Sequence, residues 1–344
     1  MNRYLKKYGV DAMGAMAQGL FCTLLVGTIL NTLGQQLDVA FLVRIGSFAS
    51  AMAGPAMAVA IGYALKAQPL VLFSLVPVGF ATNQLGGAGG PFAVYIVAIV
   101  AAELGKIVSG KTRIDILVTP LFTLLVGIGL ALLIASPVGK AASWVGNVIM
   151  WATMLHPFLM GIVVALVVGM ALTLPISSAA ICAGLSLTGL AGGAALAGCC
   201  AQMVGFAVLS FRDNRWSGVL SQGIGTSMLQ MGNIIRKPLV WVPVMLTSAI
   251  MGPLATCVFK LQMNGAAVNS GMGTCGLCGP IGVWTGWLAP SDAALASGAV
   301  AITPSAFDYL DLLLVSIVLP ALFCGLLGAI FRKAGWIRAG DLKI

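Results

Sequence analysis

Long uncharged intervals dominate the pattern of polar and apolar positions along the chain. A membrane-spanning helix needs about 20 mostly apolar residues. Nine intervals reach that length: residues 12–37, 45–65, 67–102, 116–139, 141–211, 216–235, 238–259, 261–291 and 312–331. The interval 141–211 has room for two or three crossings. We therefore predict an all-α, polytopic membrane protein with about ten transmembrane helices.

Two intervals do not resemble ordinary spanning helices. In the first, the apolar stretch 69–80 runs into the glycine-rich segment 81–91, and in the second, residues 264–280 are also glycine-rich. Glycine costs about 1 kcal/mol per helical position relative to alanine. Irregular backbone at membrane depth is tolerated only where protein covers it or where it lines an aqueous cavity. We therefore predict two re-entrant loops, the alternative being plain loops outside the membrane.

The two halves of the chain resemble each other at a fixed offset. Gly27-Thr28 and Gly54-Pro55 correspond to Gly225-Thr226 and Gly252-Pro253, 198 residues later. In each half a lysine, a glycine-rich loop and a second Gly-Pro follow. This order predicts a first repeat at 1–140, connecting membrane helices at 141–211 and a second repeat at 212–344. Repeats with broken segments at equivalent positions are typical of a transporter's substrate site, so we expect the two loops to meet near the bilayer midplane.

Composition excludes several classes of protein. Hydrophobic residues make up 60% of the chain and charged residues only 8%, whereas soluble domains have about 25% charged residues. The formal net charge of +9 comes from 18 Lys and Arg, which gather in short clusters such as Arg3, Lys6 and Lys7. Such clusters are typical of the cytoplasmic flanks of membrane helices, where they face anionic lipid. We expect lipid contact and no nucleic-acid partner.

Two titratable residues stand out because each is unique in the chain. Glu103 is the sole glutamate and His156 the sole histidine. An ionisable group at membrane depth is a functional-site hypothesis, so Glu103 is the best candidate for an ionised solute contact. Its alternative is an interfacial helix end paired with Lys106. His156 has a pKa range suited to proton handling, and its alternative is a structural role at a helix end.

The other candidate site residues are neutral hydrogen-bonding side chains in the two glycine-rich loops. They indicate a neutral, polyhydroxylated solute, and they are Thr82, Asn83, Gln84, Asn264, Asn269, Ser270 and Thr274. The Cys275-Gly276-Leu277-Cys278 motif lacks further ligands nearby, so we predict no metal site and no cofactor. Asp308 and Asp311 fit helix N-terminal acids better than a cation site.

The second loop carries a family resemblance. The order Gly-Pro, Lys, glycine-rich loop in both halves, with the loop reading NGAAVNSGMGTCGLCGP from Asn264 to Pro280, resembles the phosphotransferase-system EIIC-like membrane proteins. That class includes proteins named perfringolysin O regulator-like. The resemblance extends over almost the whole chain.

This resemblance implies a permease component of the bacterial plasma membrane that translocates a sugar or sugar-like solute by alternating access. Such a component would act in sugar phosphotransfer only with a separate EIIB protein, and we expect a homodimer. Two alternatives remain open at this point. One is a secondary transporter of a small polar solute driven by Na⁺ or H⁺, and the other is a membrane sensor or regulator that binds a solute without moving it.

Overall fold

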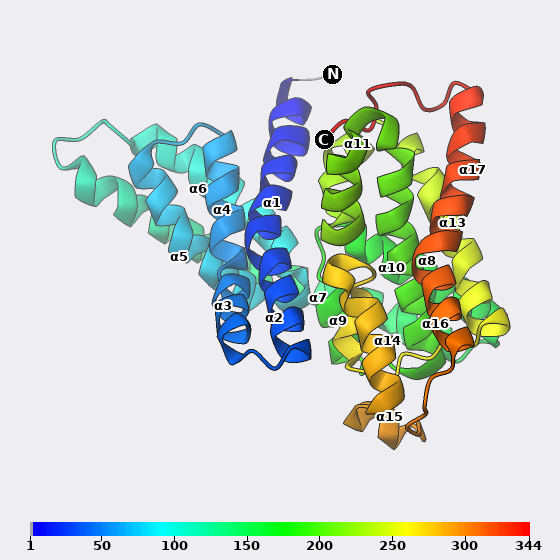
Figure 1. The fold of residues 1–344 in the computed structure, drawn as a ribbon. Coiled ribbons are helices and arrows are strands. Elements are labelled where there is room, and N and C mark those ends of the chain that lie inside the picture. The colour runs from blue at the N-terminus through cyan, green and yellow to red at the C-terminus, as the bar shows by residue number, and fades with distance from the viewer. Residues whose placement is uncertain (1–2) are drawn as a thin grey trace. The chain divides into compact units, whose positions relative to one another are not determined.

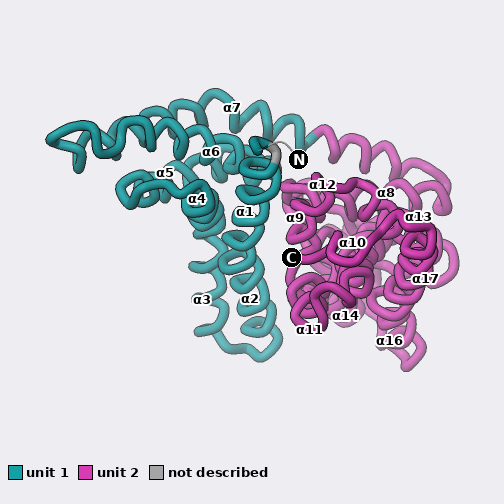
Figure 2. Tube along the Cα trace, turned by 90° about the horizontal axis from the view of Figure 1, so that it is seen from above, with its two compact units in different colours: residues 1–143 teal, residues 144–344 magenta. Residues whose placement is uncertain are grey.

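The computed structural model describes residues 3–344, and its regular elements there are all helical. Figure 1 shows the ribbon and Figure 2 its division into two compact units, residues 1–143 and residues 144–344. The first unit contains α1 Met13–Leu20, α2 Val26–Gln36, α3 Ala40–Ala51, α4 Ala53–Ala64, α5 Pro69–Gly86, α6 Gly90–Val108 and the start of α7 Asp115–Thr153.

The second unit holds the remaining helices. They are α8 Pro157–Thr173, α9 Ser178–Gly184, α10 Gly189–Leu209, α11 Phe211–Leu220, α12 Met231–Arg236, α13 Val242–Pro253, α14 Cys278–Leu288, α15 Asp292–Ala296, α16 Ala306–Leu313 and α17 Leu319–Lys333. Short 3-10 and π-helical turns join several of them. A single antiparallel bridge links Gly189 and Met263.

In the first unit, α5 and α6 form an antiparallel hairpin. Lys106 near the end of α6 donates to the Leu65 carbonyl just before α5, at 2.9 Å, and Gly105 lies against the Val71 side chain. The turn is the three residues Gly87–Gly89, of which Gly87 has φ 50°. The apolar stretch in the sequence ends at Phe80, but α5 continues to Gly86. The helix ends at Gly87, whose positive φ is a conformation that favours glycine.

In the second unit, α10 is the central helix, and almost all of its residues are buried. It packs against α8 so closely that a side chain on Gly198 would overlap the Ala165 carbonyl. Helices α8 and α13 meet in the same way at Gly161 and Gly252. Small residues let helix backbones approach each other and maximise van der Waals contact, which is how helices associate in membranes.

Six helical stretches of the described chain are long and apolar enough to cross a membrane, or seven if the bent pair α3–α4 is one span. The six are Lys6–Gln36, Pro69–Val108, Asp115–Thr153, Gly189–Leu209, Pro238–Val258 and Ala306–Lys333. The predicted ten crossings are not confirmed. An uncharged interval need not be one helix. The chain breaks within 216–235 at Thr226, which is extended, and residues 261–277 form an irregular segment with short 3-10 turns.

The segment after α17 packs against the rest of the second unit. It is held there by hydrogen bonds, by an ion pair and by the buried side chain of Leu342. Leu342 is fully buried. Its carbonyl accepts hydrogen bonds from Gln230 at 2.9 Å and from Asn214 at 2.7 Å. Lys237 forms an ion pair with Asp341 at 2.6 Å. This set of contacts fixes residues 334–344, called here the C-terminal strap.

Candidate functional site

Most of the second glycine-rich loop is buried, and hydroxyl groups donate hydrogen bonds to its backbone carbonyls. Ser178 donates to the Gly271 carbonyl at 2.7 Å, and Ser291 donates to the Gly265 carbonyl at 2.8 Å. In the opposite direction, Ser270 of the loop donates to the Leu187 carbonyl at 2.7 Å. Since buried carbonyl groups without partners are costly, these bonds explain how an irregular segment is tolerated inside the unit.

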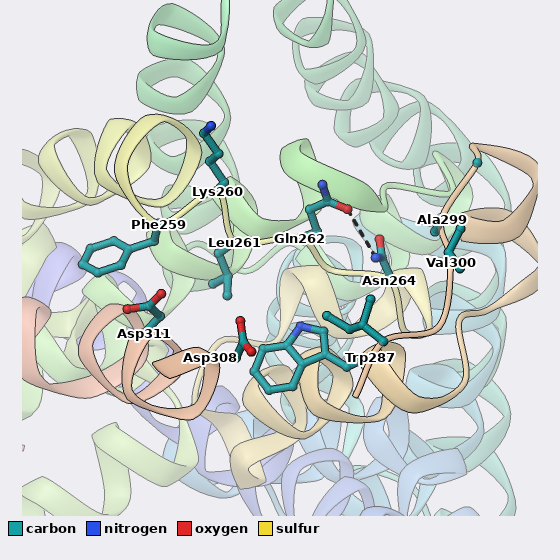
Figure 3. A pocket seen from close by; sticks show the side chains of 12 residues that line it. Phe259, Lys260, Leu261, Gln262, Asn264, Trp287, Ala299, Val300, Asp308 and Asp311 are labelled. Atoms are coloured by element: carbon teal, nitrogen blue, oxygen red, sulfur yellow. Dashed lines mark hydrogen bonds between the residues drawn. The ribbon is translucent and has the colours of Figure 1, made fainter. Parts of the chain in front are cut away.

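A cavity of about 340 Å³ lies beside this loop, and Figure 3 shows the side chains around it. Its polar and aromatic lining consists of Phe259, Lys260, Gln262, Asn264, Trp287, Asp308 and Asp311. These residues come from the chain just after α13 and its π-helical extension, from the end of α14 and from the first turns of α16. One candidate span therefore ends and another begins at the cavity.

The lining combines hydrogen-bonding groups with an aromatic surface. Asn264 and Gln262 supply amide donors and acceptors and are joined by a 3.3 Å hydrogen bond, dashed in Figure 3. Trp287 supplies an aromatic surface and packs edge-on against Tyr309, with 5.7 Å between ring centroids. Asp311 supplies a carboxylate, and charge-assisted hydrogen bonds are roughly twice as strong as neutral ones.

Asp308 has a second role at this cavity. Its carboxylate accepts hydrogen bonds from the backbone N–H and the hydroxyl of Ser305, both at 2.7 Å. With the Ser305 hydroxyl accepting from the Asp308 N–H, this is a capping box at the start of α16. The prediction of a helix N-terminal acid is thus correct for Asp308, and the cap fixes its carboxylate at the cavity wall.

The predicted residues of the second loop occupy different environments. Asn264 lines the cavity. Ser270 and Thr274 are buried, and Thr274 donates to the Gly223 carbonyl at 2.5 Å. Asn269 is half-buried, with its amide against Gly282. In this conformation Ser270 and Thr274 anchor the loop to neighbouring elements, and of these four residues Asn264, although buried, is the one that lines the cavity.

The predicted residues of the first loop lie in the last turns of α5. Thr82 is fully buried and donates to the Val78 carbonyl one turn earlier, at 2.6 Å. Asn83 packs between Gly54 and Gly90, and Gln84 is exposed. None of these three lines one of the cavities described here.

Glu103 lies far from the first glycine turn. It stands thirteen residues beyond Gly90 on α6, which is about 20 Å along a helix that rises 1.5 Å per residue. Its carboxylate pairs with Lys7 at 2.6 Å and with Lys106 at 3.0 Å. The pairing with Lys106 is the one that spacing along a helix predicted. Solute contact by Glu103 stays a prediction.

His156 is exposed at the break between α7 and α8. Its side chain does not cap α8, although its carbonyl accepts from the Met160 N–H at 2.9 Å. Cys275 and Cys278 of the C-x-x-C motif are both buried, and no group of three His, Cys, Asp or Glu side chains within residues 3–344 is arranged to hold a metal ion.

Sequence reasoning missed Trp287 and Gln262, and it noted Asp308 and Asp311 without placing them at a site. Trp287 ends an apolar helix, where an aromatic residue is normally read as core. The one available signal was local: Gln262 stands two residues before the glycine-rich loop, in a chain with few polar side chains. Residues 260, 287 and 308 come together only through the packing of separate elements, which spacing along the sequence does not predict.

The apolar spans define a multi-pass membrane protein, and a polar cavity lies beside its irregular second loop. The chain belongs to the EIIC family of the phosphotransferase system: the family model described as "Phosphotransferase system, EIIC" matches residues 10–344. This membership confirms the resemblance found in the sequence and supports a membrane permease component. No curated protein and no solved structure shows a significant match to the chain.

Proposed function

We propose that this protein is the permease component for a sugar or sugar-like solute in the bacterial plasma membrane, and that the cavity beside the second glycine-rich loop binds the solute. The observation that carries the proposal is the lining itself. It joins an aromatic surface at Trp287, neutral amides at Gln262 and Asn264, and the Asp311 carboxylate. Polar groups that converge on an aromatic wall are the usual composition of a small-molecule site.

The second loop is re-entrant in this proposal. Helix α14 has 11 residues, about half of what a membrane crossing needs, and it follows a buried irregular segment. Alternating access would then involve movement of this loop, since its hydroxyls at Ser270 and Thr274 are held by hydrogen bonds that can exchange partners. The first loop is a tight turn between two helices, so we assign the moving part to the second loop.

Two partners complete the proposal. The family supports phosphotransfer coupling, in which a separate EIIB protein would donate phosphate to the bound sugar. We also propose that the permease acts as a homodimer. An ion-coupled carrier and a sensor that does not transport are outcomes that the experiments below distinguish.

The binding site is tested with purified protein in nanodiscs and a panel of ¹⁴C-labelled hexoses, pentoses and hexitols. We expect at least one of these sugars to bind. For that sugar, Asp311→Asn should weaken affinity roughly ten- to a hundred-fold, because losing a hydrogen bond to a charged group costs about 1.5–3 kcal/mol. Asn264→Ala should weaken it roughly two- to ten-fold, because a hydrogen bond between neutral groups contributes about 0.5–1.5 kcal/mol. Trp287→Phe, which retains an aromatic face, should weaken it less than Trp287→Ala.

Trp216→Ala is the matched control, because Trp216 is 71% exposed and lies outside the cavity. Wild-type affinity in the Asn264 and Asp311 variants would reject this cavity as the site.

Glu103→Gln tests, in the same assay, whether the candidate residue inferred from the sequence contacts the solute. Its two carboxylate oxygens pair with Lys7 and Lys106. Wild-type affinity in this variant would therefore show that Glu103 is a helix end paired with lysine, whereas a ten- to a hundred-fold loss would show solute contact.

Energy coupling is tested separately. Uptake in cells that depends on phosphoenolpyruvate would indicate phosphotransfer, whereas uptake that depends on an ion gradient would indicate ion coupling.

Movement of the second loop is tested by cysteine labelling. Ser270→Cys and Thr274→Cys, in a background where the exposed Cys22 and Cys257 are serine, should be protected from a water-soluble maleimide without solute. Their labelling should change several-fold with saturating sugar, because alternating access exposes the loop. Asn269→Cys, half-buried from the start, is the control for reagent access. Unchanged protection at both buried positions, in protein that transports, would contradict a moving loop.

A further inference from the structure

A second cavity, of about 750 Å³, lies in the first unit and has a different chemistry. Five of its lining side chains are cationic: Arg3, Lys6, Lys7, Lys66 and Lys106. Asp11 is the carboxylate that lines it. The sugar site proposed above, by contrast, pairs one lysine with two aspartates. The two cavities therefore suit different ligands.

Part of this positive charge is already neutralised. Glu103 pairs with Lys7 and Lys106, as described above. The ion pairs formed by residues 3–344 do not include Arg3, Lys6 or Lys66. Five cationic side chains thus face two carboxylates, Asp11 and Glu103, which leaves an excess of three positive charges around one cavity.

Lys66 is held at the cavity by an uncommon backbone conformation. It has φ 57°, which an L-residue adopts at a cost of roughly 1–2 kcal/mol. Its N–H donates to the Tyr63 carbonyl at 2.9 Å, and the next N–H, of Ala67, donates to Gly62 at 2.9 Å. Glycine is the usual residue at such a helix end. A lysine here directs a long cationic side chain from the end of α4.

Lys260 in the second unit repeats this arrangement. It also has a left-handed backbone, with φ 47°, and it lines the other cavity. These are the two lysines that follow Gly-Pro in the two halves of the sequence. Each unit thus has a polar cavity with a left-handed lysine on its wall. The surrounding side chains then decide what each cavity binds.

We propose that the cationic cavity of the first unit binds a phosphate group. Lysine and arginine donate charge-assisted hydrogen bonds to phosphate oxygens, and the charge excess matches an anion. An anionic phospholipid headgroup is the favoured source of that phosphate. Lys6 begins one candidate span and Lys106 lies near the end of another, which is the depth of lipid headgroups.

Apolar side chains next to the cavity fit the rest of a lipid molecule. Tyr63, three residues before Lys66, is 76% exposed, and Ile107, beside Lys106, is 56% exposed. Acyl chains lying along α4 and α6 would cover these side chains while the headgroup occupies the cavity. A free phosphate ion would leave them uncovered.

The test uses the full purified chain with two probes. Native mass spectrometry measures retention of phosphatidylglycerol against phosphatidylcholine, and ³¹P NMR titration measures inorganic phosphate. We expect phosphatidylglycerol to be retained at least ten-fold better than phosphatidylcholine. The double variant Lys6→Gln/Lys66→Gln should reduce this preference at least five-fold. Lys111→Gln/Arg113→Gln removes two exposed cationic charges from the α6–α7 connection, outside the cavity, and should leave the preference unchanged.

Each outcome decides between sources or rejects the proposal. Binding of inorganic phosphate that Lys6→Gln/Lys66→Gln abolishes, without a preference for phosphatidylglycerol, supports a phosphate site and identifies the free ion as its ligand. Equal losses in the two double variants would show diffuse surface charge and overturn the proposal. Absence of binding by both probes would overturn it as well. None of these results depends on sugar binding at the other cavity.

Discussion

Replacing Gly198 with alanine is expected to destabilise the second unit strongly. A Cβ atom at this position would overlap the Ala165 carbonyl of α8, which is backbone and cannot rotate away. Gly198 is also held by α13, because Ser248 donates to the Gly198 carbonyl at 3.3 Å. Helices α8 and α10 would have to separate, and overpacking of this kind costs about 1–3 kcal/mol. Gly198→Val should prevent assembly of a monodisperse protein.

Gly325→Ala is the matched control, since it is the same change on α17 of the same unit. The nearest atom to its Cβ would be a Val208 methyl at 3.6 Å, an ordinary contact. Alanine is favoured over glycine in a helix by about 1 kcal/mol, so this variant should unfold at the same temperature as wild type or slightly higher. Thermal unfolding in detergent, followed by tryptophan fluorescence and size-exclusion chromatography, measures both. Equal midpoints for the two alanine variants would refute close helix packing at Gly198.

Replacing Leu342 with aspartate should release the C-terminal strap from the second unit. Leu342 is fully buried, and burying an unpaired carboxylate is far costlier than exposing it. Hydrogen–deuterium exchange of peptides covering 334–344 should become much faster than in wild type. Ile344→Asp is the same kind of change two residues later, at a side chain that is 48% exposed, and should leave exchange nearly unchanged. Similar exchange in the two variants would contradict a buried anchor at Leu342.

The strap should also loosen in acid. Partial burial raises the pKa of Asp341, but the Lys237 ammonium and the Arg338 N–H outweigh burial, so the pKa lies below its ordinary value of 3.8. A carboxyl group with a lowered pKa contributes stability that is complete above the ordinary value and is lost as pH falls through the folded-state pKa. Asp341→Asn, compared at each pH, should abolish the acid-induced rise in exchange. An identical rise in wild type and Asp341→Asn would exclude this pair as its cause.

The sequence by itself determined the class of protein. Uncharged stretches of about 20 residues and a charged fraction of 8% are incompatible with a soluble surface, and this inference needs no knowledge of packing. Local rules also succeeded where partners are near in sequence. The pairing of Glu103 with Lys106 and the capping role of Asp308 both follow from side chains three residues apart on a helix.

The tertiary structure decided where polar groups converge. Glu103 and the first glycine-rich loop belong to the same set of candidate site residues, but α6 carries Glu103 about 20 Å from the glycine turn, since distance along a helix is fixed by its rise of 1.5 Å per residue. Thr82, Ser270 and Thr274 looked like solute ligands, yet each donates to a backbone carbonyl in this conformation. Side chains from residues 260 to 311 meet around one cavity because α14 and α16 pack beside the loop, and such contacts are long-range. A sequence pattern specifies neighbours along one helix, whereas neighbours between helices follow from how small residues let the backbones approach.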